Sequence, residues 1–246
     1  MAVKKARLDE LVMALFPTHS RRTIQSWIMR GEVLVDGVPV TKPGTQLRSD
    51  VQILCKAEEP LYVSRAGFKL AHALDTFSVP VIDAVVLDAG LSTGGFADCL
   101  LQRGAKKVFG IDVGYGQVHE KIRTDSRVIV MERTNLRDIT PAKLGELVDL
   151  VTLDLSFISV LKVLDAVFAC MKPRASIIIL IKPQFESERH EVGKGGIIKD
   201  PAVHERVIAQ VRQALIQRGC TILGVTESPI LGATGNKEFL IAAQRT

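Results

Sequence analysis

The residues VVLDAGLSTGGF, at positions 85–96, set the architecture of most of this chain. A short apolar run ends at the acidic Asp88, and mostly small residues follow as far as Phe96. Small residues let a backbone turn sharply and approach a ligand closely. The spacing G-x-G-x-x-G, which aims amides at a dinucleotide pyrophosphate, is absent. We therefore expect a ligand-binding loop at the end of a strand, and the spacing disfavours a pyrophosphate on it.

Strand-like apolar runs alternate with helical segments in the chain around this loop, a pattern typical of a parallel sheet. A long amphipathic helix, at about 201–218, precedes two final runs at 221–230 and 238–245, which could pair antiparallel. The predicted fold class is α/β, a Rossmann-like, doubly wound and mostly parallel seven-stranded sheet that holds ligands at the carboxyl ends of its strands. The other runs lie at 85–90, 108–114, 128–133, 147–156 and 176–183.

The first sixty residues have a different pattern. Apolar residues recur at helical spacing over 8–16 and 20–29, with Ser20 well placed as an N-cap. The segment 33–40 alternates around Asp36-Gly37, a dipeptide that favours a tight hairpin, and 51–54 supplies a third strand. We expect a small α+β domain over residues 1–58, a linker over 59–63 and the sheet domain over 64–246.

Composition indicates a folded protein without a membrane span. Of the 246 residues, 47% are hydrophobic and 24% charged, which disfavours disorder. The longest apolar run, 177–181, is far shorter than the roughly 20 residues that cross a bilayer. A net charge of +5 suits a polyanionic partner but is common in other proteins. The four cysteines have no paired spacing, so we expect reduced core residues in a cytoplasmic protein and no metal site.

The strand ends suggest how a nucleoside-containing ligand could bind. Asp88 would repel a pyrophosphate but can lie near a cationic amino-acid group. Asp112, at the end of the next strand, could accept hydrogen bonds from ribose hydroxyls, in NAD as well as in other nucleosides. Asn135 could bind an adenine edge, although a loop cap is an equal alternative. The predicted cofactor residues are Asp88, Gly90, Ser92, Thr93, Gly94, Gly95, Phe96, Asp112, Asn135 and Leu136.

Four ionisable residues fall where this topology would bring them to one crevice: Lys69, Asp154, Lys182 and Glu238. Lys182 follows apolar residues at the end of a strand that should be central, and a buried lysine without a partner is costly. We expect Asp154 and Glu238 as its acidic neighbours. Buried charge at strand ends is more often functional than structural, although a structural ion pair remains an alternative.

The first domain, over residues 7 to about 56, resembles the αL-motif domain named after ribosomal small-subunit protein S-four. Two helices, the basic pair Arg21-Arg22, the stop at Gly31 and the Asp-Gly hairpin occur together. The resemblance implies binding of structured RNA, against the alternative of a solvated helix face. The predicted RNA-binding residues in both domains are Arg7, Arg21, Arg22, Arg30, Lys42, Arg65, Arg133 and Lys194.

Nearly the whole chain resembles the TlyA group of the FtsJ-like RNA ribose methyltransferases. The motifs that carry the resemblance are SRAGFKL at 64–70, DAGLSTGGF at 88–96, GIDVGYGQ at 110–117, DLSFIS at 154–159, IKPQFE at 181–186, VGKGG at 192–196 and GNKEFL at 235–240. The resemblance implies that S-adenosylmethionine is the cofactor and that cytidine 2′-hydroxyls in ribosomal RNA or ribosomal subunits are the substrate. It makes Lys69, Asp154, Lys182 and Glu238 a catalytic tetrad.

In that chemistry Lys182 would steer or remove the hydroxyl proton, because a neutral alcohol is a poor nucleophile. We expect desolvation and the Lys69 charge to tune it, and the carboxylates to orient it. The loop 185–199, with Lys194 between glycines, could close over RNA or be a disordered surface loop. No membrane insertion and no obligate protein partner are expected.

Three other classes of protein are compatible with parts of the sequence. One is a non-catalytic RNA-binding or ribosome-assembly factor, which would bind ribosomal RNA without transferring a methyl group. Another is a membrane-lytic haemolysin, a label that members of this family carry, which would make liposomes leak. The third is an NAD-dependent dehydrogenase, which nicotinamide fluorescence would reveal.

Overall fold

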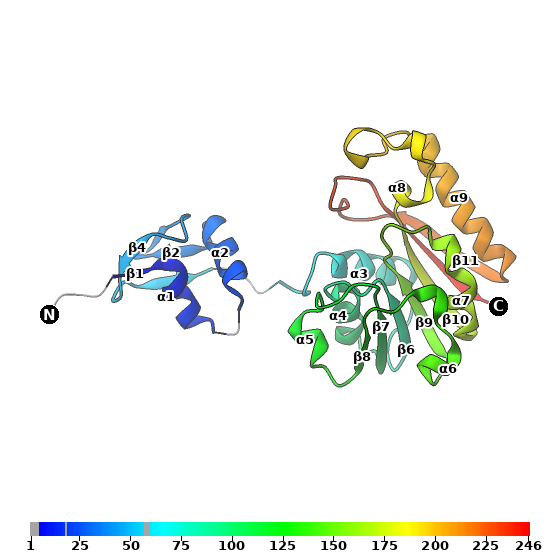
Figure 1. The fold of residues 1–246 in the computed structure, drawn as a ribbon, viewed down its shortest axis with the longest axis horizontal. Helices are drawn as coiled ribbons and strands as arrows, with labels where there is room; N and C mark the ends of the chain where they lie inside the picture. The colour runs from blue at the N-terminus through cyan, green and yellow to red at the C-terminus, as the bar shows by residue number, and fades with distance from the viewer. Residues whose placement is uncertain (1–4, 18, 57–59) are drawn as a thin grey trace. The chain divides into compact units, whose positions relative to one another are not determined.

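The computed structural model describes residues 5–17, 19–56 and 60–246. The chain divides into two compact units, Met1–Pro60 and Leu61–Thr246 (Figure 1). Residue 59 of the expected linker, with residues 57 and 58 before it, lies outside the described residues.

The first unit packs two helices on a small sheet. Ser20 caps the second helix, since its side chain accepts a hydrogen bond from the Thr23 amide at 3.2 Å. Asp36 and Gly37 have φ angles of 48° and 83°, which suit a tight hairpin turn. Trp27 lies in the apolar core between the layers. The elements are α1 (Leu8–Leu15), α2 (Arg21–Met29), a three-stranded sheet of β2 (Val33–Val35), β3 (Val38–Pro39) and β5 (Ile53–Cys55), and a pair of β1 (Lys5–Arg7) and β4 (Gln46–Arg48).

The second unit, as far as the structure describes it, is built on one seven-stranded sheet with the order β11-β12-β10-β9-β6-β7-β8. The five strands from β10 to β8 are parallel, while β12 runs antiparallel to both β10 and β11. This arrangement confirms the predicted fold class. The strands are β6 (Val85–Ala89), β7 (Lys107–Ile111), β8 (Val128–Met131), β9 (Val148–Leu153), β10 (Met171–Ile181), β11 (Cys220–Glu227) and β12 (Phe239–Arg245).

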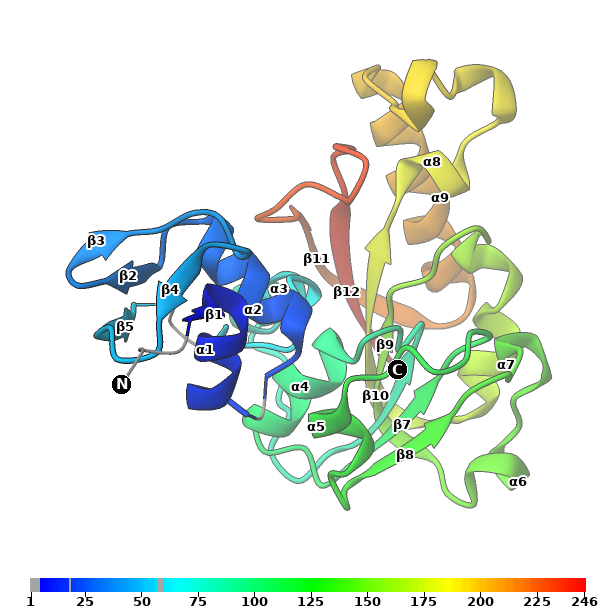
Figure 2. The ribbon, with the colours of Figure 1, turned by 60° about the vertical axis from the view of Figure 1, so that its left-hand side comes forward.

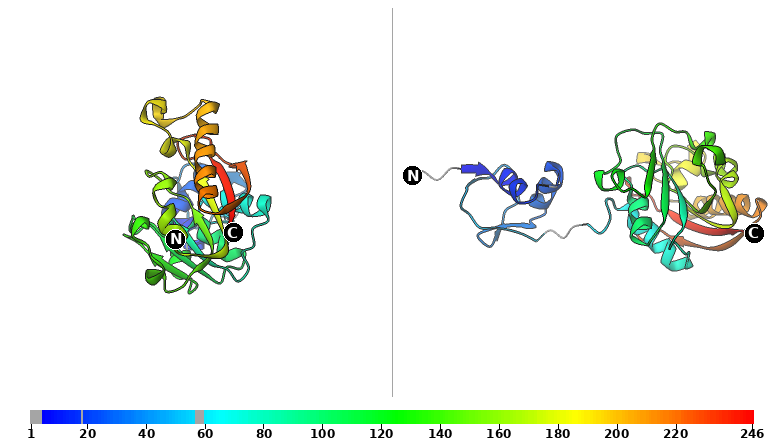
Figure 3. Two further views of the ribbon diagram at one scale, coloured as in Figure 1. Left: turned by 90° about the vertical axis from the view of Figure 1, so that its right-hand side faces the viewer. Right: turned by 90° about the horizontal axis from the view of Figure 1, so that it is seen from below.

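Helices cover both faces of this sheet (Figures 2 and 3). Side chains alternate along β10, so Ile178 packs with the helices of one face and Ile179 with those of the other. The first face carries α3 (Ala66–Phe77), α4 (Gly95–Gln102) and α5 (Glu120–Arg123). The second face carries α6 (Pro141–Leu144), α7 (Leu164–Ala169) and α9 (Pro201–Gln217). The remaining short helices are η1 (Leu136–Asp138), η2 (Val160–Lys162), α8 (Pro183–Glu186), η3 (Arg189–Glu191) and η4 (Lys194–Gly196).

The turn after β6 is tight because glycine stands where the backbone needs it. Gly90 has a φ of +86°, and a Cβ added there would lie 2.3 Å from the carbonyl oxygen of Asp154. Only glycine fits such a position, so the loop after β6 and the end of β9 touch through their backbones. The carboxyl ends of the central strands are thereby drawn together.

Two further features bear on the sequence expectations. In the described part of the chain, no helix is both long and apolar enough to cross a bilayer. All four cysteines are free, with Cys99, Cys170 and Cys220 buried and Cys55 half-buried. Burial raises the pKa of the Cys99 thiol to about 11, and it raises the pKa values of Cys170 and Cys220 as well.

Candidate active site

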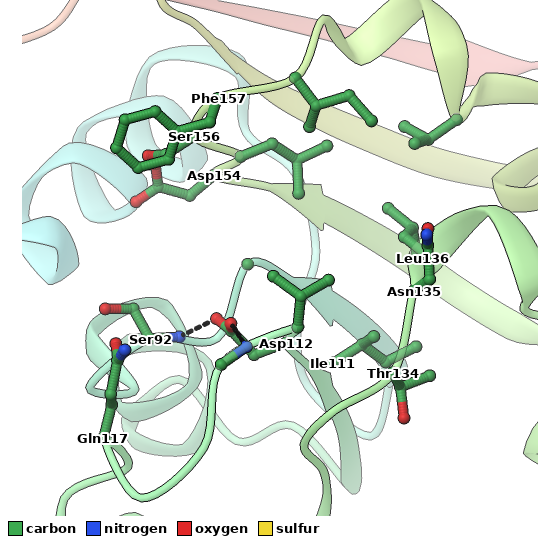
Figure 4. Close-up of a pocket in the computed structure, with 16 residues that line it drawn as sticks. Ser92, Ile111, Asp112, Gln117, Thr134, Asn135, Leu136, Asp154, Ser156 and Phe157 are labelled. Carbon is green, nitrogen blue, oxygen red and sulfur yellow. Dashed lines mark hydrogen bonds between the residues drawn. The ribbon is translucent and has the colours of Figure 1, made fainter.

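A cavity of about 340 Å³ opens at the carboxyl ends of the parallel strands. Its walls come from the segments that follow β6, β7, β8 and β9, including Gly90, Asp112, Asn135 and Asp154 (Figure 4). Apolar side chains such as Leu136 line it beside these polar groups. The topology predicted a ligand site at this edge of the sheet, and the cavity lies there.

Asp112 is fixed at the floor of the cavity by backbone amides. Its two carboxylate oxygens accept hydrogen bonds from the amides of Ser92 and Gly114, each at 2.7 Å (Figure 4). Each oxygen of a carboxylate can accept a further hydrogen bond. The predicted contact with ribose hydroxyls is therefore compatible with the geometry, in a carboxylate that is already oriented.

Asn135 acts as a cap, which the sequence analysis gave as the alternative to an adenine contact. Its side-chain oxygen accepts a hydrogen bond from the Arg137 amide at 3.0 Å and so caps the short helix η1. The residue also lines the cavity, and its Nδ2 can still donate to a ligand. Leu136, next in the chain, is buried and presents an apolar surface to the same cavity.

Asp88 does not line the cavity, contrary to what the strand end suggested. It is fully buried, and its Oδ1 accepts a hydrogen bond of 2.8 Å from Thr152 on β9. Its Oδ2 has no hydrogen-bond partner among the described residues. Burial, helped by the nearby Asp154 charge, raises the pKa of Asp88 to about 7.

The second half of the glycine-rich loop also turns away from the cavity. Gly94 packs on Ile122, and Gly95 packs against Ser64. The side chain of Phe96, in the first turn of α4, lies in the apolar core. Thr93 is exposed and is not part of the lining. Of the residues predicted from this loop, only Gly90 and Ser92 reach the cavity.

The four tetrad residues form two ion pairs. Lys182 Nζ lies 2.7 Å from Asp154 Oδ1 and donates a hydrogen bond of 2.9 Å to Ser156 Oγ. The Asp154 contact is electrostatic, because Oδ1 accepts no hydrogen bond of normal geometry among the described residues. Lys69 Nζ, on α3, lies 2.5 Å from Glu238 Oε2, and both of these side chains are at least nine-tenths buried.

The strand register brings the two pairs to neighbouring positions. The last residues paired between β10 and β12 are Ile181 and Phe239, so Lys182 and Glu238 follow at adjacent strand ends. We expected both carboxylates beside the Lys182 ammonium. That expectation is wrong for Glu238: in the described part of the chain its ion pair is with Lys69. The partner differs because the α3 lysine reaches over the same strand end.

Phe157 is a cavity residue that the sequence analysis missed. Its side chain is 92% exposed, and its φ of 66° lies in the left-handed region that a bulky residue rarely adopts. Its ring lies 5.2 Å from that of Phe185. Ser156, the Lys182 partner, was also missed. A large aromatic three residues after the strand-end acid Asp154 was the available signal.

The predicted RNA-binding residues are exposed, apart from the half-buried Arg7, and they differ in their partners. Arg7 and Arg21 both bond to the buried carboxylate of Asp9, and Arg30 pairs with Glu32 at 2.7 Å. The guanidinium of Arg133 stacks over the Tyr115 ring, with 4.1 Å to the ring centroid. The others, Arg22, Lys42, Arg65 and Lys194, are exposed.

The loop that carries Lys194 is held by a buried amide. Asn236 Oδ1 accepts a hydrogen bond from the Ile198 amide at 2.9 Å, and Nδ2 donates to the Gly196 carbonyl at 2.8 Å. Asn236 is fully buried. The expected surface loop is thus anchored beside the start of β12. The anchoring residue, Asn236, is two residues before Glu238 in the sequence.

The lining of the cavity fits a nucleoside-containing cofactor. Its volume is within the range for small-molecule sites, which is roughly 300–1,000 Å³. It offers an oriented carboxylate at Asp112, an amide at Asn135 and an apolar wall at Leu136. These are the groups that a ribose, an adenine edge and an adenine face require.

Known proteins resemble the chain over nearly its full length. The family model for FtsJ-like methyltransferase matches residues 62–245, and that for the S4 domain matches residues 6–53. The 16S/23S rRNA (cytidine-2′-O)-methyltransferase TlyA of Mycobacterium tuberculosis is 41% identical over 239 residues, 97% of this chain and 89% of the relative. Hemolysin A of Brachyspira hyodysenteriae is 41% identical over 235 residues, 95% and 98% of the two chains.

A solved structure supports the fold. A SAM dependent methyltransferase from Aquifex aeolicus superposes with a TM-score of 0.51 at 23% identity, over 75% of this chain and 94% of that one. The family model covers three quarters of the sequence, and it confirms the resemblance inferred from the motifs. The chain therefore belongs to the FtsJ-like methyltransferase family and carries an S4 domain ahead of its methyltransferase domain.

Proposed function

We propose that this protein transfers the methyl group of S-adenosylmethionine to the ribose 2′-hydroxyl of a cytidine in ribosomal RNA. The observation that carries the proposal is the ion pair of Lys182 with Asp154 at the edge of a nucleoside-sized cavity. The 41% identity to an enzyme named for this reaction supports the same substrate.

The cofactor residues in this proposal follow from the cavity lining. Asp112 would hold the ribose, and Asn135 and Leu136 would hold the adenine. Gly90 and Ser92 would contact the part of the molecule that lies toward the loop after β6. When bound, S-adenosylmethionine supplies an electrophilic methyl group on a sulfonium.

In this proposal Lys182 acts on the ribose hydroxyl. The Lys182 ammonium first releases a proton to solvent, and the neutral Nζ then orients the hydroxyl. Nζ takes up the hydroxyl proton as the oxygen bonds to the methyl carbon and the bond from that carbon to the donor sulfur breaks. Asp154 stabilises the resulting ammonium at 2.7 Å, and the Ser156 hydroxyl fixes the direction of Nζ. The pair of Lys69 and Glu238 lies at the adjacent strand end, where each of the two charges neutralises the other.

We assign RNA binding to both units. Residues 1–58 would form the RNA-binding domain, 59–63 the linker and 64–246 the catalytic domain. The exposed basic residues would contact phosphates, which position an RNA without reading its sequence. The proposed site of action is the cytoplasm, on ribosomal RNA or ribosomal subunits, without membrane insertion and without an obligate protein partner.

The test is transfer of tritiated methyl groups to ribosomal RNA. Lys182→Ala should lower the rate by roughly 10²–10⁴-fold, the usual contribution of a positioned general base, and should leave RNA binding intact. Lys172→Ala is the matched control, because Lys172 pairs with Asp149 near the other end of β10 and lies outside the cavity. Its activity should stay at the wild-type level.

Other outcomes would favour other classes of protein. RNA binding without methyl transfer in the wild type would indicate an assembly factor. Leakage of liposomes caused by the purified protein would favour the lytic activity that the name hemolysin A suggests for a relative. Equal activity of wild type and Lys182→Ala would remove Lys182 from the mechanism.

A further inference from the structure

Five consecutive residues after β9, Asp154 to Ile158, line the cavity. This cavity wall contains the Asp154 and Ser156 partners of Lys182 and also Phe157, with its left-handed backbone. A non-glycine residue in that conformation persists only when its surroundings hold it. Something outside the wall must therefore fix its course.

Glu186, on α8, holds the far end of this wall. Its Oε2 accepts a hydrogen bond of 2.6 Å from Ser159 Oγ, and its Oε1 accepts one of 2.9 Å from the Val160 amide. Both bonds fall immediately after Ile158, the last of the five lining residues. The carboxylate thus closes a bridge between two chain segments that are 26 residues apart.

The same short segment touches the wall at three points. Lys182 contacts its start, the Phe185 ring packs on that of Phe157, and Glu186 bonds to its end. Of these three contacts, only the last joins a side chain to the backbone, at the Val160 amide just beyond the wall. The backbone bond fixes where the chain runs, whereas the other two contacts fix only side chains.

The environment of Glu186 indicates that these bonds matter to the site. Burial raises the pKa of this carboxyl, against the smaller opposing effects of its hydrogen bonds and of the Lys162 charge. Burying a carboxylate costs free energy unless hydrogen bonds compensate it. A hydrophobic side chain would fill the space without that cost but could not hold the Val160 amide.

We propose that Glu186 is a positioning residue for methyl transfer. It holds the Asp154–Ile158 wall so that Ser156 and Phe157 keep their places and the acceptor ribose stays aligned with Lys182. This inference rests on the proposed function, since it names a further residue of the same site. Glu186 itself does not line the cavity, so it acts through the wall and touches neither reactant.

Glu186→Ala should lower kcat on the order of tenfold to a hundredfold, the effect of a small misplacement at a catalytic site. Glu186→Gln should recover most of the activity, because the amide oxygen can accept from the Val160 amide while its NH₂ donates to the Ser159 hydroxyl. Ser159→Ala removes one of the two bonds and should give an intermediate kcat. Glu205→Ala, an exposed glutamate on α9, is the control.

A double-mutant cycle separates positioning from a general loss of stability. If Glu186 acts by holding Phe157, then Phe157→Ala should cost much less in the Glu186→Ala background than in the wild type. Residues that act independently give effects on kcat that multiply to within about twofold. The thermal unfolding midpoints of all four proteins are measured alongside.

Multiplying effects, or a Glu186→Ala kcat equal to that of wild type, would overturn the inference. If Glu186→Ala fails to fold, the Glu186→Gln and Ser159→Ala variants test the inference in its place. A wild-type kcat in Ser159→Ala together with a large loss of kcat in Glu186→Gln would contradict the proposed bridge. A wild-type protein that transfers no methyl group would instead refute the proposed function.

Discussion

Asp88 shows how burial changes the chemistry of one side chain. Its carboxyl group has a pKa of about 7 in the folded protein, against an ordinary value of 3.8. Between these values the folded state binds a proton that the unfolded chain does not. The stability of the protein should therefore fall as the pH rises from about 4 to about 7.

Asp88→Asn should remove this dependence, because the amide keeps an oxygen for the Thr152 hydroxyl and carries no charge. Relative to wild type, the variant should gain stability by about 1.4 kcal/mol for each pH unit between those limits. Urea unfolding at pH 5 and pH 8 measures the difference. A variant whose stability relative to wild type is the same at both pH values would show that Asp88 is not buried as a neutral acid.

The Lys69–Glu238 pair is a second case in which one buried group depends on another. Lys69→Ala leaves the Glu238 carboxylate without its cation and should destabilise the fold by about 3–5 kcal/mol. The double variant Lys69→Ala/Glu238→Ala should lose much less than the sum of the single losses. Denaturant unfolding of the four proteins tests this, and strictly additive losses would contradict the pairing.

The strand-end charges and the pairing of Lys182 with Asp154 were predictable from the sequence, but the partners of Glu238 and Asp88 were not. Acidic and basic residues directly after apolar runs identified Asp112, Asp154 and Lys182. Sequence cannot say which of two adjacent residues faces a cavity, because side chains alternate across a strand and one position changes the face. For that reason Asp88 was placed at the ligand, although it bonds to Thr152 inside the sheet.

Among the structural elements, the turn after β6 is the least tolerant of change. Gly90→Ala would combine a left-handed backbone with a Cβ only 2.3 Å from the Asp154 carbonyl oxygen. We expect a loss of several kcal/mol in stability, well above the roughly 1–2 kcal/mol of backbone strain alone. Weaker binding of the methyl donor should accompany it.

Gly116→Ala is the matched comparison for this prediction. Gly116 also has a positive φ, of +72°, but no atom lies within 4 Å of an added Cβ. This variant should show only the cost of backbone strain. Thermal unfolding of the two variants distinguishes the two effects. Equal losses of stability would mean that the close approach to Asp154 does not contribute to the cost of Gly90→Ala.

Long elements with strong periodicity were predicted well, and so was the short hairpin marked by Asp36-Gly37, but one pair of short strands was not. The parallel strands and the helix at 201–218 appear close to their expected positions. The pair of β1 and β4 was missed, since three-residue strands carry almost no pattern and form only through tertiary contacts. The strand expected at 147–156 ends at Leu153, where the cavity wall begins.

For the molecule as a whole, the net charge of +5 predicts RNA binding that depends on salt. Arg22→Ala and Lys42→Ala should each weaken ribosomal RNA binding and lower the slope of log K against log salt by about 1. Arg30→Ala should have a smaller effect, because Glu32 already neutralises its guanidinium. Filter binding at several salt concentrations tests all three, and affinity for the methyl donor should stay constant.

The motifs of the whole chain identified the family, because seven motifs in one order are far more specific to a family than any single motif. The way in which the glycine-rich loop divides between cavity and core could not be predicted. That division depends on how Gly94 and Gly95 pack against Ile122 and Ser64, residues distant in the sequence.

The distribution of thiols has a practical consequence. Alkylating reagents need an accessible sulfur, and the second unit buries its three cysteines and disfavours their thiolates. Cys55, half-buried at the end of β5, is the remaining target. A maleimide dye added to the native protein would therefore label the first unit alone, two residues beyond the S4 match, which supplies a fluorescent reporter of RNA docking without engineering.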